Sequence, residues 1–190
     1  MGIRNLVVLV AAAYALPAIA QESYVVDPAH SRPTWEVRHI GMSLQRGSFD
    51  KIAGKITLDR AAKKGTVDIT IDANSIKPFD PRLDSILRGD KFFNVEKFPA
   101  MEFKSDDVVF DGDRVVRVNG KFTMLGVTKP MTLQVADFKC GEQTFNKKPM
   151  CAADASGTIK RSDYGMTEGL NVGNPGDEIR LLIPVEAYKQ

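Results

Sequence analysis

Asp27, His30 and Ser31 bring the three side-chain types of a nucleophilic triad into one short segment, DPAHS. In a triad the base must take a proton from the nucleophile. Successive side chains of an extended chain point to opposite faces, so His30 and Ser31 cannot easily share that proton. The sequence has no second nucleophile motif of the Gly-x-Ser-x-Gly kind. We therefore expect no catalytic residues and a protein that is not an enzyme.

His30 and His39 are the two histidines of the chain and the first candidates for a metal site. In one extended segment they lie ~30 Å apart and on opposite faces, so they cannot share a metal unless the chain folds back. His39 instead follows the face of Trp35 and Val37, which predicts an interior or mouth position. The glycines between 165 and 176 lack the strand before and helix after of a phosphate-binding loop. We expect no metal ion and no cofactor.

Cys140 and Cys151 form an even pair, which in an oxidising compartment usually means a disulfide. It would close a loop of about ten residues and contribute about 2–3 kcal/mol. The alternatives are a redox-active pair or a metal site, and neither a Cys-x-x-Cys spacing nor a nearby histidine favours them. We expect a structural disulfide on a loop outside the main wall of the fold.

Residues 1–20 have the features of a cleavable export signal. Arg4 is followed by the apolar run Leu6 to Leu16, and Ala18-Ile19-Ala20 gives a small-x-small cleavage pattern before Gln21. A membrane anchor is the alternative, but it needs ~20 apolar residues. We expect residues 1–20 to be removed, and residues 21–190 to form one domain that is periplasmic or secreted.

Charges of both signs are interspersed along the chain, which carries 26 Lys+Arg and 24 Asp+Glu. No basic run is longer than two residues. Phosphate contacts need a concentrated basic face, so we expect no nucleic acid partner.

Period-2 alternation of apolar and polar residues dominates the rest of the chain and predicts strands with one dry face. Within 116–124, for example, Val116, Val118, Phe122 and Met124 share a face. Asp80 as N-cap, Pro81 at the first helical position and Gly89 as C-cap predict one short helix near 81–90. Eight strands are expected, near 32–40, 46–59, 65–74, 100–110, 113–124, 130–140, 151–160 and 178–188.

An even number of strands with short connections favours an all-β fold, a closed eight-stranded antiparallel up-and-down barrel, because closure removes exposed edges. A two-sheet sandwich fits the same alternation. An outer-membrane barrel would need its apolar face outward, and the many charged residues on the wet faces argue against it.

Side-chain size decides whether such a barrel is hollow, because eight strands leave an interior just wide enough for side chains or one small ligand. Ala153, Ala155 and Gly157 leave space on one face of the strand 151–160. The alternative is that large neighbours such as Trp35 and Phe122 fill that space. A hollow barrel roughly 25 Å tall would suit a long, thin, apolar guest.

Several ordered motifs together resemble the YceI-like family of exported lipid-binding proteins: DPAHS at 27–31, Trp35 followed by His39, GSFDKIAGKITLD at 47–59, SILRGDKFFNVEKFPAMEFKS at 85–105, NGKFTMLGVTKPMTL at 119–133 and GTIKRSDYGM at 157–166. The resemblance covers essentially residues 21–190. It implies a lipocalin-like barrel with an apolar cavity, a periplasmic or secreted location, and a polyisoprenoid ligand such as a prenyl quinone or prenyl phosphate. The sequence departs from the pattern at the cysteine pair and at Trp35, where Phe is usual.

The expected function is therefore that of a carrier for a long-chain apolar lipid, which is the expected partner. Two alternatives stay open, an enzyme acting on an isoprenoid lipid and a filled-barrel stress-response or interaction module. A homodimer and transient contact with a membrane are compatible with the sequence.

The expected lipid-binding residues are those that share the dry face of the strands, with Phe92 beside the helix. They are Trp35, Val37, His39, Phe49, Ile56, Leu58, Val67, Ile69, Ile71, Phe92, Met101, Phe103, Val118, Phe122, Met124, Leu133, Val135, Ala153, Ala155, Gly157 and Ile159. Polar residues expected at the mouth, where they would orient a headgroup, are His30, Ser31, Arg88, Lys91 and Arg161.

The cleavage pattern makes a direct prediction about the mature protein. Intact-mass measurement of protein from the native host should give an N-terminus at Gln21. Recovery of residues 1–20 in a membrane fraction would contradict the cleavable signal.

Overall fold

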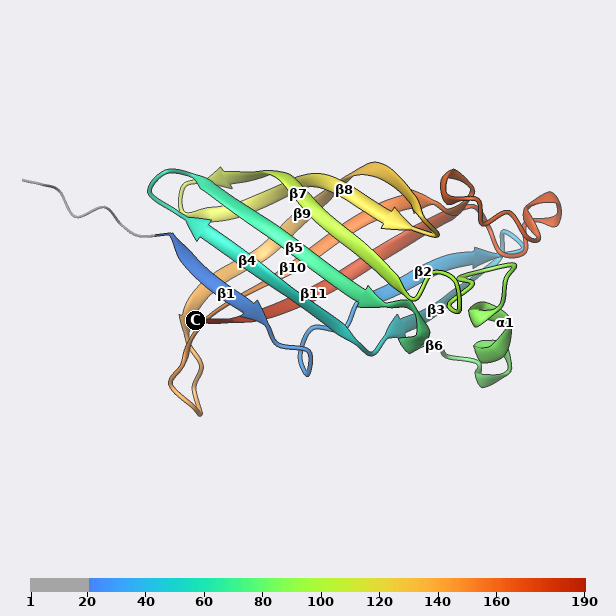
Figure 1. The fold of residues 1–190 in the computed structure, drawn as a ribbon, viewed down its shortest axis with the longest axis horizontal. Coiled ribbons are helices and arrows are strands. Elements are labelled where there is room, and N and C mark those ends of the chain that lie inside the picture. Colours follow the sequence, from blue (N-terminus) through green and yellow to red (C-terminus); the bar gives the residue numbers. More distant parts are fainter. Residues whose placement is uncertain (1–20) are drawn as a thin grey trace, which may run out of the picture.

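The computed structural model describes residues 21–190, and the expected signal segment 1–20 lies outside the described residues. One antiparallel sheet of eleven strands makes up the molecule, and it closes on itself where β1 pairs with β11 (Figure 1). The strands are β1 (Glu22–Val26), β2 (Thr34–His39), β3 (Ser43–Phe49), β4 (Ile52–Asp59), β5 (Lys64–Asp72), β6 (Ile76–Pro78), β7 (Ala100–Asp111), β8 (Arg114–Met124), β9 (Val127–Glu142), β10 (Pro149–Lys160) and β11 (Glu178–Lys189).

Eight of these strands form the closed ring, in the order β1-β4-β5-β7-β8-β9-β10-β11 and back to β1. The predicted eight-stranded antiparallel barrel is therefore confirmed. Two predicted strands are wrong in detail, because 32–40 corresponds to β2, outside the ring, and 46–59 divides into β3 and β4. The remaining strands extend the wall at one end. β2 lies beyond β1 along the same strand β11, with Val26 opposite Ala187 and Trp35 opposite Leu181. β3 then pairs with β2, and β6 pairs with β3.

The short strand β1 was not expected from the sequence, although it closes the barrel by pairing with both β4 and β11. Its residues do alternate, because Tyr24 and Val26 are buried, whereas Ser23 and Val25 are more exposed. Five residues are too short a segment to stand out beside the export signal that precedes them.

The helical segment is shorter than the predicted span 81–90. It divides into a 3-10 turn η2 (Pro81–Leu83) and the helix α1 (Asp84–Arg88). Asp80 caps η2 by accepting a hydrogen bond from the Arg82 N–H, and Gly89 is the C-cap of α1. No helix within residues 21–190 combines the length and the hydropathy that crossing a bilayer requires.

β-Bulges change which residues point inward. In the β7–β8 pair the register shifts between Ser105 and Asp107. Met101 and Phe103 are buried before the shift, and Val108 is buried after it. A bulge inserts one extra residue, so the alternation that follows it has the opposite parity.

The same effect corrects the expectation for Val116. A second register shift in the β7–β8 pair turns Val115 inward, where it is buried, and leaves Val116 half-exposed. In the β9–β10 pair the shift lies between Ala152 and Asp154, and Phe138 packs against the core beyond it.

The disulfide Cys140–Cys151 is present and joins directly opposed residues of β9 and β10. Cys151 is buried, so the disulfide lies in the wall of the barrel, and the expected position outside the wall is wrong. Only the hairpin beyond it, 143–148, projects from the barrel (Figure 1).

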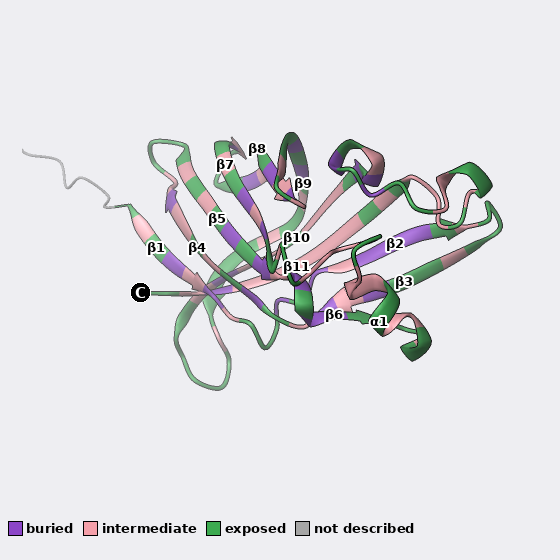
Figure 2. Ribbon diagram, turned by 45° about the vertical axis from the view of Figure 1, so that its right-hand side comes forward, coloured by how far each residue is buried: buried purple, intermediate pink, exposed green. Residues whose placement is uncertain are grey.

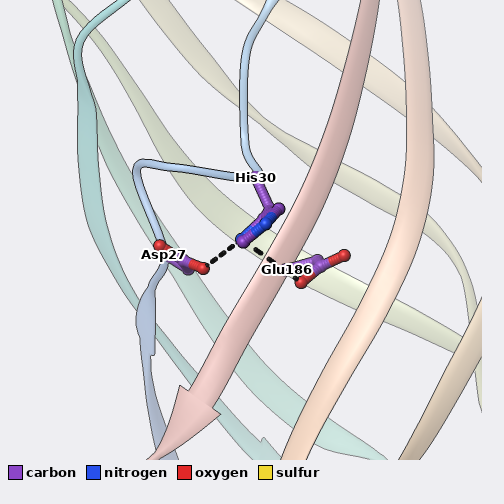
Figure 3. A group of neighbouring side chains, drawn as sticks. All are labelled: Asp27, His30 and Glu186. Atoms are coloured by element: carbon purple, nitrogen blue, oxygen red, sulfur yellow. Dashed lines mark hydrogen bonds and ion pairs between the residues drawn. The ribbon is translucent and has the colours of Figure 1, made fainter. Parts of the chain in front are cut away.

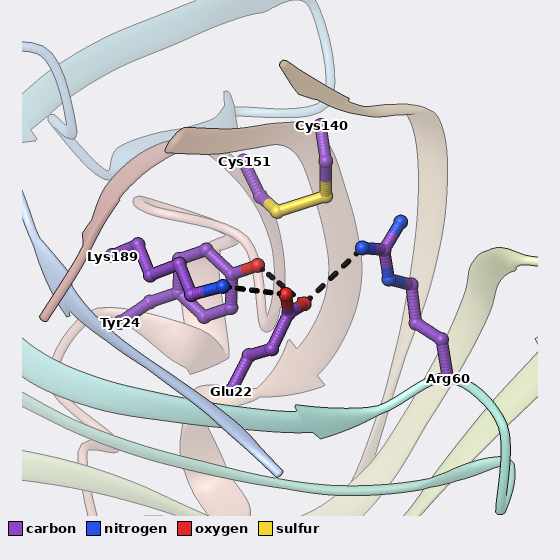
Figure 4. Close-up of a disulfide and its surroundings, with 6 residues drawn as sticks. All are labelled: Glu22, Tyr24, Arg60, Cys140, Cys151 and Lys189. Carbon is purple, nitrogen blue, oxygen red and sulfur yellow. Dashed lines mark hydrogen bonds and ion pairs between the residues drawn. A yellow bond between two sulfur atoms is a disulfide. The ribbon is translucent and has the colours of Figure 1, made fainter. Parts of the chain in front are cut away.

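A charged cluster centred on Glu22 lies beside the disulfide, at the end of the barrel that carries the C-terminus (Figure 4). The Glu22 carboxylate accepts hydrogen bonds from Lys189 Nζ at 2.7 Å, the Tyr24 hydroxyl at 2.9 Å and Arg60 at 3.2 Å. These partners belong to β1, to β11 and to the turn after β4, the segments that meet where the barrel closes. The hydrogen bond from Lys189 is the main cause of a lowered pKa of Glu22.

We expect Glu22→Gln to lower the free energy of unfolding by about 1–2 kcal/mol at pH 7, because the carboxylate would lose its charge-assisted hydrogen bonds. Since the pKa of Glu22 is lower in the folded state than its ordinary value of 4.5, its stabilisation is present above pH 4.5 and is lost as the pH falls through the folded pKa. Denaturant unfolding at several pH values should show the two proteins converging in acid. Glu142→Gln, at an exposed position on β9, is the control and should change little. A constant difference at every pH would contradict the role of the charge.

Candidate ligand-binding cavity

The interior of the barrel holds a cavity of about 760 Å³. Ligand-binding pockets fall in the range of about 300–1,000 Å³. Hydrocarbon and aromatic side chains from all wall strands form most of its lining. Figure 2 shows the underlying pattern, in which buried and exposed bands alternate along strands such as β5 and β7. The barrel is therefore hollow, and its space is apolar.

Every residue expected to line the interior lies on this cavity except Gly157. A Cβ atom at Gly157 would lie 2.8 Å from Met131 Cε and 3.1 Å from Leu133 Cδ2. The space beside Gly157 is thus occupied by these two side chains. Placement on the wall is what the structure shows, and contact with a lipid stays a prediction.

Trp35 does not fill the interior, because its ring lies against the backbone of β3. A Cβ atom at Gly47 would collide with the Trp35 ring atoms Cζ2 and Cε2. Glycine at position 47 therefore lets the indole lie flat on the wall, which is a close-approach role for a glycine in a strand. Small residues on β10, Ala153 and Ala155, leave further space on the wall.

The polar groups of the lining gather at one end, which we call the mouth. They include His39 on β2, Gln45 on β3, Asp80 and Arg82 beside η2, and Asn174 in the loop before β11. Arg82 is exposed, so this end opens to solvent. The opposite end is lined by residues that are fully buried, Tyr24, Val108, Val115, Cys151 and Ala187.

Several lining residues missed by the sequence analysis belong to the mouth. Leu83, Ile86, Leu87, Phe93 and Met166 lie in or beside short helical turns and loops. No period reveals the inward face of such segments, because each turn sets its own direction. The cavity-facing residues of β11, Ile179, Leu181, Ile183 and Val185, do follow the predicted alternation.

His30 and Ser31 do not lie at the mouth, which corrects their expected role. Both belong to the connection between β1 and β2, which runs along β11. Ser31 Oγ is fully buried, donates to the Glu186 carbonyl at 3.1 Å and accepts from the Glu186 N–H at 2.9 Å. Ser31 therefore fastens this connection to β11, and its hydroxyl has no free role in headgroup binding.

Asp27, His30 and Glu186 bring metal-ligating atoms within 4.8 Å of one another (Figure 3). Such donors would suit a divalent cation. His30 Nδ1, however, already donates to Asp27 at 2.7 Å and lies 3.9 Å from Glu186. The hydrogen bond between His30 and Asp27 raises the pKa of His30 and lowers the pKa of Asp27. The three groups thus form an ion-pair network on the surface.

Arg88 and Lys91 lie near the mouth without lining the cavity. Arg88 donates to the carbonyls of Asn74 and Ile76 at 3.0 Å, which anchors α1 to β6. Lys91 is exposed, and its Nζ lies 3.9 Å from Glu168 across the mouth. Arg88 therefore has a structural role, whereas Lys91 keeps a position on the rim, where a headgroup contact stays a prediction.

Arg161 does line the cavity, but its donors are used by the protein itself. Its guanidinium is buried and donates to the carbonyls of Met166, Glu168, Pro175 and Gly176, at 2.7–2.9 Å. Burial lowers its pKa. Arg161 therefore organises the loop 162–177 from inside, and its contact with a headgroup stays a prediction.

Residues 24–187 match the family model described as the YceI-like domain. The chain belongs to the YceI-like family. The family resemblance carried by the sequence motifs is thereby confirmed.

Other YceI-like proteins show how far the likeness extends. Protein YceI of Salmonella arizonae is 33% identical over 176 residues, which cover 91% of this chain and 90% of that protein. BcnA of Burkholderia cenocepacia has a TM-score of 0.68 at 22% identity, over 85% of this chain and 98% of the other. A polyisoprenoid binding domain from Saccharophagus degradans has a TM-score of 0.64 at 15% identity, over 88% and 98%. At these sequence identities, the likeness to the two solved structures shows that this chain shares their fold.

Replacing Arg161 by Met should lower the free energy of unfolding by about 3 kcal/mol or more, because several carbonyls would lose a charged donor. The loss should be local at first, so amide exchange should accelerate most within 162–177. Arg180→Met, on an exposed side chain of β11, should cost at most about 1 kcal/mol. Equal effects of the two substitutions, or exchange that accelerates uniformly, would contradict the organising role of Arg161.

Proposed function

We propose that this YceI-like protein is a periplasmic carrier of a long-chain apolar lipid, most simply a polyisoprenoid such as a prenyl quinone or a prenyl phosphate. The observation that carries the proposal is the cavity itself, whose wall is apolar and whose polar groups gather at one end. A polyisoprenoid has the matching chemistry, a long hydrocarbon tail and one polar headgroup.

Burial of the tail supplies the binding energy in this proposal. Each buried methylene contributes about 0.8 kcal/mol. The tail contacts the predicted lining residues, including Ala153, Ala155 and Trp35. The headgroup lies at the mouth near His39, Gln45 and Arg82, which line that end. The polyisoprenoid binding domain from Saccharophagus degradans, which shares the fold, supports this ligand class.

A periplasmic or secreted location is supported by the disulfide, because such bonds persist in oxidising compartments. The export-signal pattern at residues 1–20 points the same way. Catalysis has less support. Ser31 Oγ is engaged by Glu186, and His39 is the one histidine among the cavity-lining residues. Asp80, a lining carboxylate, is held by Arg82 through hydrogen bonds of 2.6–3.1 Å.

Purified protein offers a direct test. Native mass spectrometry and organic extraction should recover a bound lipid, and recovery of that lipid unchanged after incubation supports a carrier. Conversion of the lipid would indicate an enzyme, and an empty barrel would indicate an interaction module. Trp35, the one tryptophan of the chain, lies on the cavity wall, so its fluorescence should report titration with a soluble short-chain prenyl quinone.

Ala155→Phe should displace the lipid, because the added ring enters the cavity. A hollow barrel tolerates the ring, whereas a filled one loses about 1–3 kcal/mol through overpacking. Ser156→Phe is the matched control, one residue along β10 on the opposite face. Lipid content after extraction and thermal stability should be measured for both. Full lipid content in Ala155→Phe, or loss in Ser156→Phe alone, would contradict the proposed tail site.

A further inference from the structure

Large apolar side chains are exposed to solvent around the mouth of the cavity. Ile40 and Met42 lie in the turn between β2 and β3, Phe79 lies between β6 and η2, Ile86 lies on α1, and Val172 lies in the loop before β11. Figure 1 places these segments at the end that carries α1. Among the described residues one more large hydrophobic is exposed, Phe145, in the hairpin at the opposite end.

The segments that carry these side chains touch one another and form a continuous rim. The Ile40 N–H donates to the Gly173 carbonyl at 3.0 Å, so the β2–β3 turn contacts the loop that holds Val172. The Phe79 N–H donates to the Arg46 carbonyl at 3.2 Å, which joins the η2 segment to β3. We call Ile40, Met42, Phe79, Ile86 and Val172 the apolar rim.

The apolar rim is continuous with the cavity. Ile86 is exposed and also lines the cavity, as do its helix neighbours Leu83 and Leu87. The hydrogen-bonded wall is interrupted here, because β6 pairs with β3 alone, and β7 pairs with β5 only up to the Asp72–Ala100 step. An apolar path therefore leads from the exposed rim to the interior beside α1.

The charge of the rim is positive where most of its apolar side chains lie. Segment 38–46, with Ile40 and Met42, carries two arginines and no carboxylate. Segment 77–91, with Phe79 and Ile86, carries four basic and three acidic residues. The acidic excess of the rim is confined to the third segment, 161–177, where Glu168 lies 3.9 Å from Lys91. Apolar side chains beside basic ones match the chemistry of an anionic lipid surface.

Backbone strain at Ile40 also fits a role of its exposed side chain in binding another surface. Ile40 has a φ of +47°, in the left-handed region, which a β-branched residue rarely adopts. A glycine or asparagine would relax the turn, but neither would present a large apolar side chain to solvent.

We propose that the apolar rim docks on the surface of an anionic phospholipid bilayer and turns the cavity mouth toward the acyl chains. This inference rests on the proposed function, since it gives the route by which a lipid tail enters and leaves. The apolar side chains enter the interface, and the exposed cations Arg38, Lys77 and Lys91 face the phosphate groups.

Vesicle binding tests this docking surface. The full mature protein should sediment with vesicles of phosphatidylethanolamine and phosphatidylglycerol, and less well with phosphatidylcholine alone. The double variant Met42→Ser/Phe79→Ser should reduce the partition coefficient about tenfold or more, because two apolar side chains no longer enter the interface. Both side chains are about three-quarters exposed, at 76% and 73%, so thermal stability should not change.

Phe145→Ser is the matched control, since Phe145 is 91% exposed at the opposite end of the barrel. It should leave vesicle binding unchanged. Three results would overturn the docking surface. They are equal losses of vesicle binding in the two variants, no vesicle binding by the unmodified protein, and a protein dimer that Met42→Ser/Phe79→Ser dissociates. Titration of Trp35 fluorescence with a soluble prenyl quinone separates the two proposals. If the quinone does not bind, the proposed function fails; if it binds while vesicles do not, the docking surface alone fails.

Discussion

Closure of the sheet into a ring is the constraint on which the rest of this structure depends. In a closed antiparallel barrel alternate residues of every strand must point inward, and the number of strands limits the space they share. With eight strands in the ring, the choice between a filled and a hollow interior rests on a few inward side chains. Ala153 and Ala155 on β10, and a glycine at 47 that lets Trp35 lie flat, favour the hollow outcome.

The two ends of the barrel are built by different interactions. At one end β1 closes the ring between β4 and β11, where Glu22 gathers Lys189, Tyr24 and Arg60, and buried residues line the cavity. At the other end the wall continues as β2, β3 and β6, and loops complete it. Arg161 holds one of these loops through its backbone carbonyls. This asymmetry places most polar lining residues of the cavity at the second end, the mouth.

Polar groups at one end of an apolar cavity determine which ligands suit the protein. An apolar tail gains free energy along the whole depth of the barrel, whereas a headgroup would lose its hydration there without recovering it in hydrogen bonds. The orientation of an amphiphile in the cavity therefore follows from where the polar groups lie. The same end presents the apolar rim, so the proposed entry and the proposed membrane contact share one face of the molecule.

The sequence by itself determined most of the strands and most of the inward faces of this protein. Alternation predicted the barrel, and nearly all of the residues that it placed inside do line the cavity. A strand with one buried face shows that face directly in the order of its residues. Ordered sequence motifs also carry the resemblance to the YceI-like family, to which the chain belongs. Bulges reverse the alternation before Val108, Val115 and Phe138, so their inward positions were not predicted. One inserted residue changes which face the following residues occupy, and the sequence pattern does not reveal the insertion.

Only the tertiary structure decided the chemistry of the polar residues and of the mouth. Arg161 and Ser31 have the residue types of ligand contacts, yet their hydrogen bonds reach backbone groups that are distant in sequence or held in irregular loops. No local period encodes such partners. Likewise, Ile40, Phe79 and Val172 are single apolar residues in separate loops, and they form one rim only because barrel closure brings those loops to the same end.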